Sequence, residues 1–364
     1  MKRAFTTAAV IVVVMIAYLC LWPVPIEPKA WSGPVTRGYT GAHAANNKLG
    51  SLKTIALQGE QGPEHLAVGK DGKLYAAMDS GAILRMSLDG STQEEFTRHG
   101  GRVLGFDFDA SGNLIAADAT KGLLSISPDK TITVLADRVE GQPIRYANSV
   151  VVAGTGKVYF TDSSTRFSPA QTGTFLAGVY DMLEQSCTGR VLEFDPATRS
   201  MRVLARGLCF ANGVALGSDG QSLFVNETGK FRIWKIAMAA NGLDVNQPSP
   251  LAKVLLDNLP GYPDNLMRGL EGRIWVGFVK PRNPILDKLA DKPFLRKLIV
   301  RLPRAWWPIP KVYGHVMAFS EDGKVLMDLQ DPSGAYPETS GVTETADRLF
   351  IQSLHAKTLG WLPR

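Results

Sequence analysis

The segment "FANGVALGSDGQSLFVNE", from Phe210 to Glu227, decides the fold because its pattern recurs along the chain. A short apolar strand comes first and a polar turn with glycine and aspartate follows. A second β-rich strand then follows. Other segments with the same order are 62–79, 101–118, 146–162, 262–278 and 336–355.

This repeat predicts an all-β protein, a six-bladed β-propeller. Most units are followed by two further strand-like runs, such as "AILRMSL" and "GLLSISP". Self-similarity at about 40 to 75 residues, with four strands per unit, is typical of propellers. The last unit ends at Arg364, soon after its third strand. We therefore expect the run 49–57, "LGSLKTIAL", to supply the missing outer strand and close the ring, which removes an exposed sheet edge. The propeller is expected over 49–364.

The N-terminus has a different character. After Lys2 and Arg3, the nineteen residues from Ala4 to Trp22 carry no charge. As a helix they span about 28 Å, close to the thickness of a bilayer core. We expect a signal anchor or transmembrane segment within 1–30 and a linker over 31–48. The alternative is an unusually long signal peptide, although "YLCLWPVPIEP" offers no small-residue cleavage site. With the positive end inside, a membrane-anchored propeller would lie on the periplasmic, extracellular or lumenal side.

The net charge of +6 is concentrated in one segment. Between 280 and 311, nine Lys/Arg stand against two Asp, so the rest of the chain is close to neutral. This distribution argues against a broad basic surface, and we expect no nucleic-acid partner. Most of this basic segment, residues 283–311, is predicted to be a basic amphipathic insertion in the fifth blade. Its leucines recur at near-helical spacing on both sides of Pro293, and two adjacent tryptophans follow at Trp306 and Trp307. Two interpretations stay open: a segment that binds the membrane interface, and a lid packed on the propeller.

The starts of the inner strands of a propeller converge at one end of its axis. Four of the six starts carry a carboxylate or an amide in the same register. Any one of them could simply be a turn residue. Side-chain oxygens without clustered Cys or His are typical of a Ca²⁺ site. The pattern therefore predicts one calcium ion on the axis, with these ligands: Glu64, Asn148, Asn212, Asp264 and, directly after it in "LPGYPDNL", Asn265.

The ends of the second strands return to the same face and would form a polar rim. They are Asp79, Asp118, Asp162, Glu227, Lys280 and His355, and turn chemistry is the alternative for most of them. His355 is the histidine that this register places at a strand end on the site face, so it is the candidate base. Cys187 and Cys209 fall nearly opposite each other across a hairpin centred near residue 198. A disulfide and two buried thiols are both open interpretations.

Three stretches together resemble the strictosidine synthase-like family, in the branch that includes the adipocyte plasma membrane-associated proteins. They are "RYANSVVVAGTGKVYFTDSSTRF" (145–167), "TGRVLEFDPATRSMRVLARGLCFANGVAL" (188–216) and "LPGYPDNL" (259–266). That family is similar to the paraoxonases and to the gluconolactonase and regucalcin group, which are six-bladed propellers with calcium in the central channel. The resemblance implies that a ligand pattern of Glu, Asn, Asn and Asp falls on Glu64, Asn148, Asn212 and Asp264, and that the paraoxonase pattern adds Asn265.

Two departures from these relatives bear on chemistry. The glutamate that serves as a base in the plant synthase falls at Ser340 here, with Glu338 nearby, which makes strictosidine synthesis itself a poor fit. Many relatives among the hydrolases carry a polar residue at the start of the second blade, and this chain has Leu104-Gly105.

The leading expectation is a calcium-dependent hydrolase of esters or lactones, similar to an arylesterase or lactonase. The cation would polarise the carbonyl, and either His355 would activate water or Asp264 would attack directly. A serine hydrolase does not fit, because "GTGKV" and "SSTRF" lack the G-x-S-x-G spacing. The alternatives are a non-catalytic, membrane-anchored binding propeller with a structural calcium and, with less support, an amine-aldehyde condensation enzyme. The expected partners are a small ester or lactone and the membrane.

Overall fold

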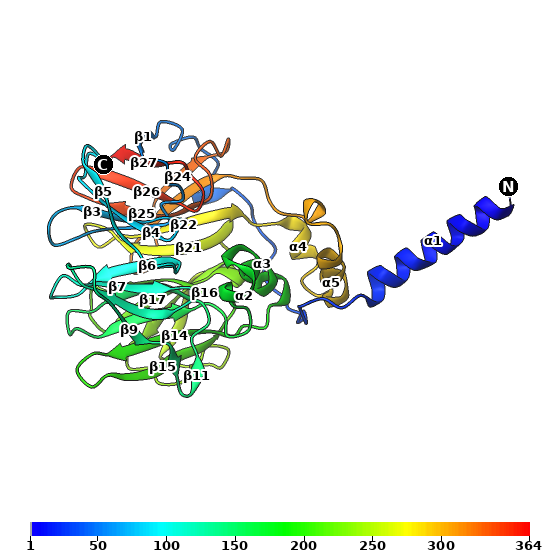
Figure 1. Ribbon diagram of the computed structural model, residues 1–364, viewed down its shortest axis with the longest axis horizontal. Helices are drawn as coiled ribbons and strands as arrows, with labels where there is room; N and C mark the ends of the chain where they lie inside the picture. The colour runs from blue at the N-terminus through cyan, green and yellow to red at the C-terminus, as the bar shows by residue number, and fades with distance from the viewer. Residues whose placement is uncertain (1) are drawn as a thin grey trace.

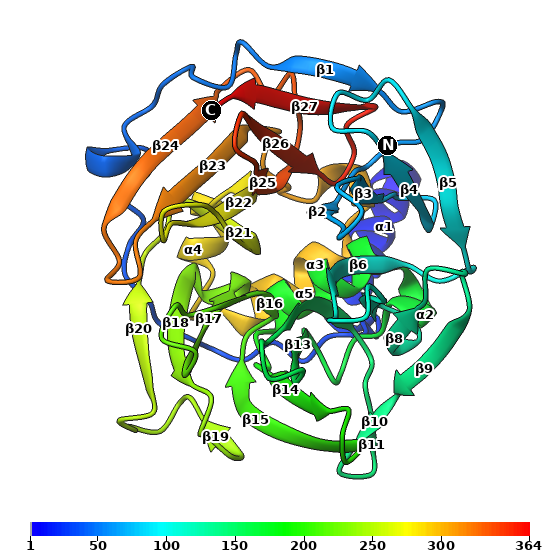
Figure 2. The ribbon, with the colours of Figure 1, turned by 90° about the vertical axis from the view of Figure 1, so that its left-hand side faces the viewer.

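The computed structural model describes residues 2–364 and forms a ring of six antiparallel sheets around a central axis (Figure 2). In each blade the first strand lies nearest the axis. Blade one consists of β2 (His65–Val68), β3 (Leu74–Ala77), β4 (Ala82–Met86) and β5 (Gln93–Arg98). Blade two consists of β6 (Val103–Phe108), β7 (Leu114–Asp118), β8 (Gly122–Ile126) and β9 (Ile132–Ala136). Blade three consists of β12 (Ala147–Val152), β13 (Val158–Asp162), β14 (Gly189–Asp195) and β15 (Ser200–Leu208). Blade four consists of β16 (Ala211–Leu216), β17 (Ser222–Glu227), β18 (Arg232–Ala237) and β20 (Ala252–Leu256).

Blades five and six complete the ring. They are β21 (Gly261–Arg268), β22 (Ile274–Pro281), β23 (Gly314–Phe319), β24 (Val325–Asp331), and β25 (Thr339–Glu344), β26 (Arg348–Ser353), β27 (Thr358–Pro363), β1 (Lys53–Ala56). β1 pairs antiparallel with β27, with Lys53 opposite Trp361 and Ala56 opposite Thr358. The predicted six-bladed propeller and its closure by the segment before the first unit are confirmed. Closure joins the N-terminal strand to the last blade, so the ring has no open edge there.

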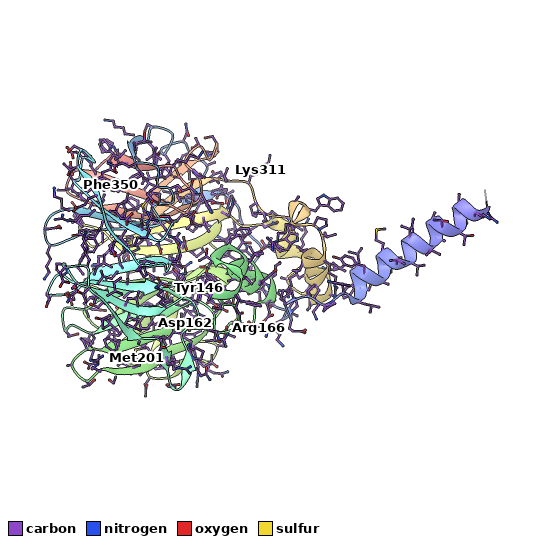
Figure 3. All side chains as sticks on the ribbon, viewed as in Figure 1. Tyr146, Asp162, Arg166, Met201, Lys311 and Phe350 are labelled. Atoms are coloured by element: carbon purple, nitrogen blue, oxygen red, sulfur yellow. A yellow bond between two sulfur atoms is a disulfide. The ribbon has the colours of Figure 1, made fainter. Side chains whose placement is uncertain are left out.

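The second strands of blades three and four are buried on both faces because each is covered by neighbouring blades. All five residues of β13 and all six of β17 are buried. Phe160, Phe224, Phe319 and Phe350 are fully buried, each in a different blade. This explains why these strands read as nearly continuous apolar runs rather than as an alternating pattern. Figure 3 shows side chains filling the ring, with Phe350 far from the end where Arg166 and Lys311 lie.

Helices gather at one end of the ring, which we call the helical cap (Figure 1). The cap consists of α2 (Pro169–Thr172), α3 (Thr174–Glu184), α4 (Pro284–Lys288), α5 (Pro293–Arg301) and the 3-10 turn η3 (Arg304–Trp306). The insertion in blade five is thus helical as its spacing indicates. Pro293 begins α5 rather than interrupting a helix, because proline is tolerated in the first helical turn. α2 and α3 lie between β13 and β14, and the repeat pattern of the sequence does not predict them.

The N-terminal helix α1 (Lys2–Leu21) projects away from the capped end of the propeller (Figure 1). Its segment Arg3–Leu21 has a mean hydropathy of 2.5 and is long and apolar enough to cross a membrane. The chain then passes under the cap and around the ring through a 3-10 turn, η1 (Gly41–His43), before β1 begins. A single apolar helix that could serve as a membrane anchor is therefore present, as expected.

Smaller elements decorate the third and fourth blades. β10 (Arg138–Val139) and β11 (Gln142–Pro143) form a hairpin, β19 (Leu243–Asp244) adds to β15 in parallel, and η2 (Thr228–Lys230) follows β17. Cys187 and Cys209 are joined in a disulfide. The two cysteines lie just beyond Gly189 and Leu208, which face each other at the open end of the β14–β15 hairpin. Of the two interpretations left open by the sequence, the structure has the disulfide.

Candidate active site

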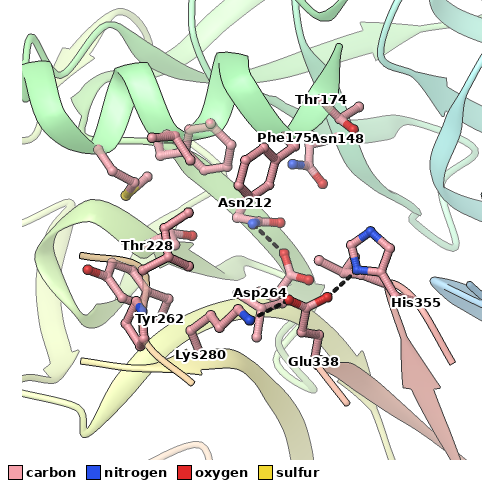
Figure 4. A pocket seen from close by; sticks show the side chains of 18 of the residues that line it. Asn148, Thr174, Phe175, Asn212, Thr228, Tyr262, Asp264, Lys280, Glu338 and His355 are labelled. Carbon is pink, nitrogen blue, oxygen red and sulfur yellow. Dashed lines mark hydrogen bonds and ion pairs between the residues drawn. The ribbon is translucent and has the colours of Figure 1, made fainter. Parts of the chain in front are cut away.

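A cavity of about 240 Å³ lies between the starts of the inner strands and the helical cap. Its polar side chains lie on the strand side, and Figure 4 shows them facing α3 across the cavity. Four residues predicted from strand register all line it, each from a different blade. They are Glu64 before β2, Asn148 on β12, Asn212 on β16 and Asp264 on β21. The other polar lining residues include Asp79, Arg102, Lys280, Glu338 and His355.

Asn212 and Asp264 form the central pair of the site. Asn212 donates a hydrogen bond from Nδ2 to Asp264 Oδ1 at 2.5 Å. The amide oxygen of Asn212, Oδ1, and the second carboxylate oxygen of Asp264, Oδ2, are buried and have no hydrogen-bond partner within residues 2–364. Burial, reinforced by the neighbouring Glu64, raises the pKa of Asp264 well above its ordinary value. The pair thus holds two oxygens that are desolvated and free to bind a positive group.

Glycines at two inner strands allow this convergence. A Cβ on Gly213, next to Asn212, would lie 2.2 Å from Leu266 N and 2.5 Å from Asp264 O. A Cβ on Gly105 would lie 2.8 Å from Asn148 O. Only glycine therefore lets the neighbouring strands approach closely enough for side chains from separate blades to meet. Gly105 is part of the Leu104-Gly105 pair that stands where many related hydrolases carry a polar residue. In this chain the glycine allows the close packing of blades two and three.

Glu64 is engaged by an arginine that the sequence analysis missed. Arg102 donates to Glu64 Oε2 from Nη2, which also lies 3.8 Å from Asp79 Oδ1. Its Nη1 donates to Met78 O at 2.6 Å. Burial raises the pKa of Glu64, and Arg102 opposes that effect by favouring the charged carboxylate. One of the four candidate ligands therefore already has a positive partner.

A second acid–base group lies at the edge of the same cavity. His355 Nδ1 and Lys280 Nζ contact the two oxygens of Glu338, the lysine at 2.6 Å (Figure 4). Burial alone would raise the pKa of Glu338, but the hydrogen bonds from His355 and Lys280 outweigh it and lower that pKa. The hydrogen bond to Glu338 in turn raises the pKa of His355. Glu338 has φ of +49°, a left-handed conformation that non-glycine residues rarely adopt and that often marks functional positions.

The cap side of the cavity is apolar. α3 contributes Phe175, Val179, Met182 and Leu183, and the insertion contributes Leu286, Ile299, Trp307 and Ile309. Tyr146 and Phe210 complete this side, and their rings meet edge to face with centroids 5.3 Å apart. A cavity with a few polar groups at one end and an apolar wall at the other is the usual form of a site for small organic molecules.

The remaining predicted residues lie outside the cavity. Asn265 is buried and donates from Nδ2 to Glu64 O at 2.9 Å, so the structure places it between blades and not in the lining. Ser340 is also buried and donates to Glu64 O at 2.8 Å, which leaves no carboxylate at the position of the synthase base. The three acidic strand ends of blades two to four are buried and paired away from the cavity. Asp118 pairs with His99 in the connection between blades one and two, Asp162 with Arg190 and Glu227 with Arg232.

The donor set fits a hard cation such as Ca²⁺. The observation that carries this is the pair of buried, unpartnered oxygens on Asn212 and Asp264, beside the carboxylate of Glu64 and the amide of Asn148 in one cavity. All four side chains are at least nine-tenths buried, and none offers a soft donor. Asn265 does not line the cavity, and its role as a ligand stays a prediction.

Another cluster of titratable residues lies away from the cavity. His43 Nδ1 and His315 Nε2 both contact Asp328 Oδ2, at 2.8 and 3.0 Å. Gln330 donates to the other carboxylate oxygen. Asp328 is thus already satisfied by several side chains, and the cluster fastens the segment before β1 onto β23 and β24.

Two matches to family profiles fall on this chain. "Strictosidine synthase" matches residues 148–241, and "Strictosidine synthase-like, N-terminal" matches 41–86. The protein strictosidine synthase-like 13 of Arabidopsis thaliana is 36% identical over 241 residues, covering 64% of this chain and 57% of that protein. The match therefore spans less than two thirds of that relative's length. The adipocyte plasma membrane-associated protein of Danio rerio is 31% identical over 366 residues, covering 92% of this chain and 83% of that protein.

Solved structures with the same fold include two that are similar over most of the chain. A gluconolactonase from Xanthomonas campestris has a TM-score of 0.61 at 20% identity, covering 93% of this chain and 99% of that chain. A calcium-binding protein, regucalcin, from Agrobacterium tumefaciens has a TM-score of 0.58 at 13% identity, covering 85% and 93%. At these identities the likeness concerns the fold alone.

Proposed function

Because the chain belongs to the strictosidine synthase-like family of propellers, we propose that it is a calcium-dependent hydrolase of esters or lactones. The observation that carries this proposal is the meeting of two groups in one cavity. Four oxygen-bearing side chains come from four blades, and a His355–Glu338 pair lies beside them. Buried carboxylates are costly unless they are paired or bind a cation, and their gathering in one cavity supports a functional role for both groups.

Glu64, Asn148, Asn212 and Asp264 would hold the cation in this proposal. When bound, Ca²⁺ would polarise the substrate carbonyl and stabilise the negative charge that develops on its oxygen. Asn212 orients Asp264 through the 2.5 Å hydrogen bond and so leaves Oδ2 available. Arg102 favours the charged form of Glu64 and so opposes the rise in pKa that burial causes. The same charge would compete with a cation, which predicts modest rather than very tight calcium affinity.

His355 is the proposed base. Its Nδ1 is occupied by Glu338, which leaves Nε2 to accept a proton from water. The water oxygen then bonds to the carbonyl carbon, the acyl C–O bond breaks, and His355 returns the proton to the departing oxygen. Glu338 is a positioning residue, and Lys280 holds its other oxygen. Because the pKa of His355 is raised, the rate should climb with pH through a value above 6.5.

Direct attack by Asp264 is the second route within the same function. Burial raises its pKa, and this weakens the carboxylate as a nucleophile until a cation restores its charge. A single turnover in ¹⁸O-water, with mass spectrometry of product and enzyme, tests for direct attack. Attack by water puts the label into the acid product and leaves the enzyme unlabelled. Attack by Asp264 releases the alcohol and forms a mixed anhydride; water that opens this anhydride at the Asp264 carbonyl leaves an unlabelled enzyme oxygen in the acid product and puts the label into Asp264.

The proposed location is a membrane, with α1 as a single-pass anchor and the propeller on the periplasmic, extracellular or lumenal side. The positive N-terminus supports this orientation, since Lys and Arg favour the cytoplasmic side. The disulfide between Cys187 and Cys209 supports it independently, because disulfides persist in oxidising compartments.

The test of the function is hydrolysis of a panel of aryl esters and lactones by the full chain, with calcium and with chelator. We expect turnover that is lost in chelator, restored by calcium and reduced at least 100-fold in His355→Ala. Circular dichroism in chelator serves as the folding control. Turnover that is indifferent to both calcium and His355 would refute the proposal.

A second function, ligand binding without turnover, is favoured by one observation. Arg102 already neutralises Glu64, as a cation would, so the cavity could persist as a binding pocket around a structural ion or none. Thermal stability that falls in chelator, together with no turnover across the whole panel, would support this reading. The condensation of an amine with an aldehyde has weaker support, since Ser340 supplies no base.

A further inference from the structure

The membrane-spanning candidate α1 is fastened directly to the cap. Arg301, near the end of α5, donates from Nε to Trp22 O at 2.7 Å and from Nη1 to Leu19 O at 2.9 Å. Tyr18 donates from its hydroxyl to Arg301 O at 3.0 Å. The last carbonyls of a helix lack partners within it, and a cation there also favours the negative end of the helix dipole. Arg301 therefore caps α1 and fixes it to α5.

The chain after α1 strengthens this attachment. Glu27 N donates to Glu184 Oε2 and Lys29 N donates to Glu184 O, both at 2.7 Å. Trp31 N donates to Ala290 O at 3.1 Å, and Ile26 is fully buried beneath the cap. The segment between the helix and the propeller is thus bound between the end of α3 and the α4–α5 connection, which leaves no free tether at this point. In Figure 1, α1 extends away from the capped end roughly along the propeller axis, so the cap lies on the side toward any membrane that α1 crosses.

The cap exposes several large apolar and aromatic side chains. Trp306 is 70% exposed, and Ile285 and Phe294 are each more than half exposed. Phe175 and Ile309 are exposed while also lining the cavity, so they form part of its rim. The basic residues divide into two groups. Arg296 and Arg301 are buried and donate hydrogen bonds to backbone carbonyls. Four other basic residues of the insertion are exposed to solvent: Lys288, Lys292, Arg304 and Lys311.

From these contacts we propose that the cap lies in the interfacial layer of the bilayer crossed by α1, and that the cavity takes amphiphilic esters or lactones directly from that layer. Exposed Trp, Phe and Ile with Lys and Arg around them suit the boundary between head groups and acyl chains. The apolar wall would hold an acyl chain while the ester group reaches the polar end. The substrate half of this proposal rests on the proposed function; the position of the cap does not.

The position of the cap is tested with the full chain in vesicles of phosphatidylcholine and phosphatidylglycerol. In a Cys20→Ser background, an environment-sensitive fluorophore is attached at Trp306→Cys, Ile309→Cys or the control Leu270→Cys. Leu270 is 40% exposed, close to the 42% of Ile309, but lies in the β21–β22 turn at the opposite end of the blade. We expect quenching by brominated lipid at 306 and 309, and quenching by aqueous iodide at 270. Iodide quenching at all three positions, or protection at 306 and 309 from both quenchers, overturns the proposal.

Substrate access is tested by comparing a long-chain ester embedded in the vesicles with a short, soluble ester. In Phe294→Glu/Trp306→Glu, turnover of the embedded ester should fall at least fivefold, with the soluble ester unchanged, because neither residue lines the cavity. Equal turnover of the embedded ester by the variant and the parent refutes access through the cap. If no ester is turned over, the proposed function fails, and the fluorophore measurement alone still decides the position of the cap.

Discussion

Asp264→Asn should abolish most calcium binding without harming the calcium-free fold. The substitution keeps the size of the side chain and removes one charged ligand. Losing a charged partner costs about 1.5–3 kcal/mol, which corresponds to roughly 10- to 100-fold weaker binding. Without calcium the variant should be at least as stable as the parent, because burial and Glu64 raise the pKa of Asp264 and disfavour its charge. The substitution removes that cost.

The assay is thermal unfolding of the full chain, with chelator and with calcium at 100 times the dissociation constant of the parent. Binding then stabilises the parent by about 2.7 kcal/mol and a variant with 100-fold weaker affinity by about 0.4 kcal/mol. At about 2 °C per kcal/mol for a domain of this size, the calcium-dependent shift in Tm should be near 5 °C and below 1 °C respectively. Asp347→Asn, an exposed charge in the β25–β26 turn, is the matched control. An undiminished shift in Asp264→Asn refutes the assignment of this ligand.

Three further results are expected. Glu338→Gln should lower the pKa of His355, which Glu338 now raises, so the rising limb of the pH–rate profile should move to lower pH; an unmoved limb would remove Glu338 from this role. Burial raises the pKa of Asp181 on α3 to about 7. The protonated Asp181 is therefore favoured in the folded protein. Its contribution to the free energy of unfolding is complete below about pH 4 and is lost as pH rises toward 7. Asp181→Asn should unfold at a higher urea concentration than the parent at pH 8, but not at pH 4. Reducing the Cys187–Cys209 disulfide should cost about 2–4 kcal/mol in urea unfolding, and a change near zero would contradict that estimate.

The sequence predicted the fold and the placement of four polar side chains, because both depend on strand register, which repeats in every blade. Glu64, Asn148, Asn212 and Asp264 share a register and therefore share an end of the axis. Long-range pairing was beyond this reasoning. The Arg102–Glu64 contact joins two blades through a flexible side chain, and no local pattern specifies it.

The cap was predicted only in part for the same physical reason. The insertion around Pro293 shows helical spacing, so its helices could be expected. Helix α3 interrupts the run between two strands of blade three, and the repeat pattern assigns its residues to no element. Asn265 was expected beside Asp264 as a ligand, but successive residues on a strand point to opposite faces, so the two side chains diverge. Its amide instead bridges blades.

The most direct test of the central claim is a calcium titration of the full chain in which binding and ester or lactone turnover are measured on the same sample. The account predicts one calcium per chain, with turnover rising in proportion to occupancy and both responses lost together in Asp264→Asn. Turnover that is already maximal in chelator, or calcium that binds to saturation while turnover of the panel stays at background, would contradict it.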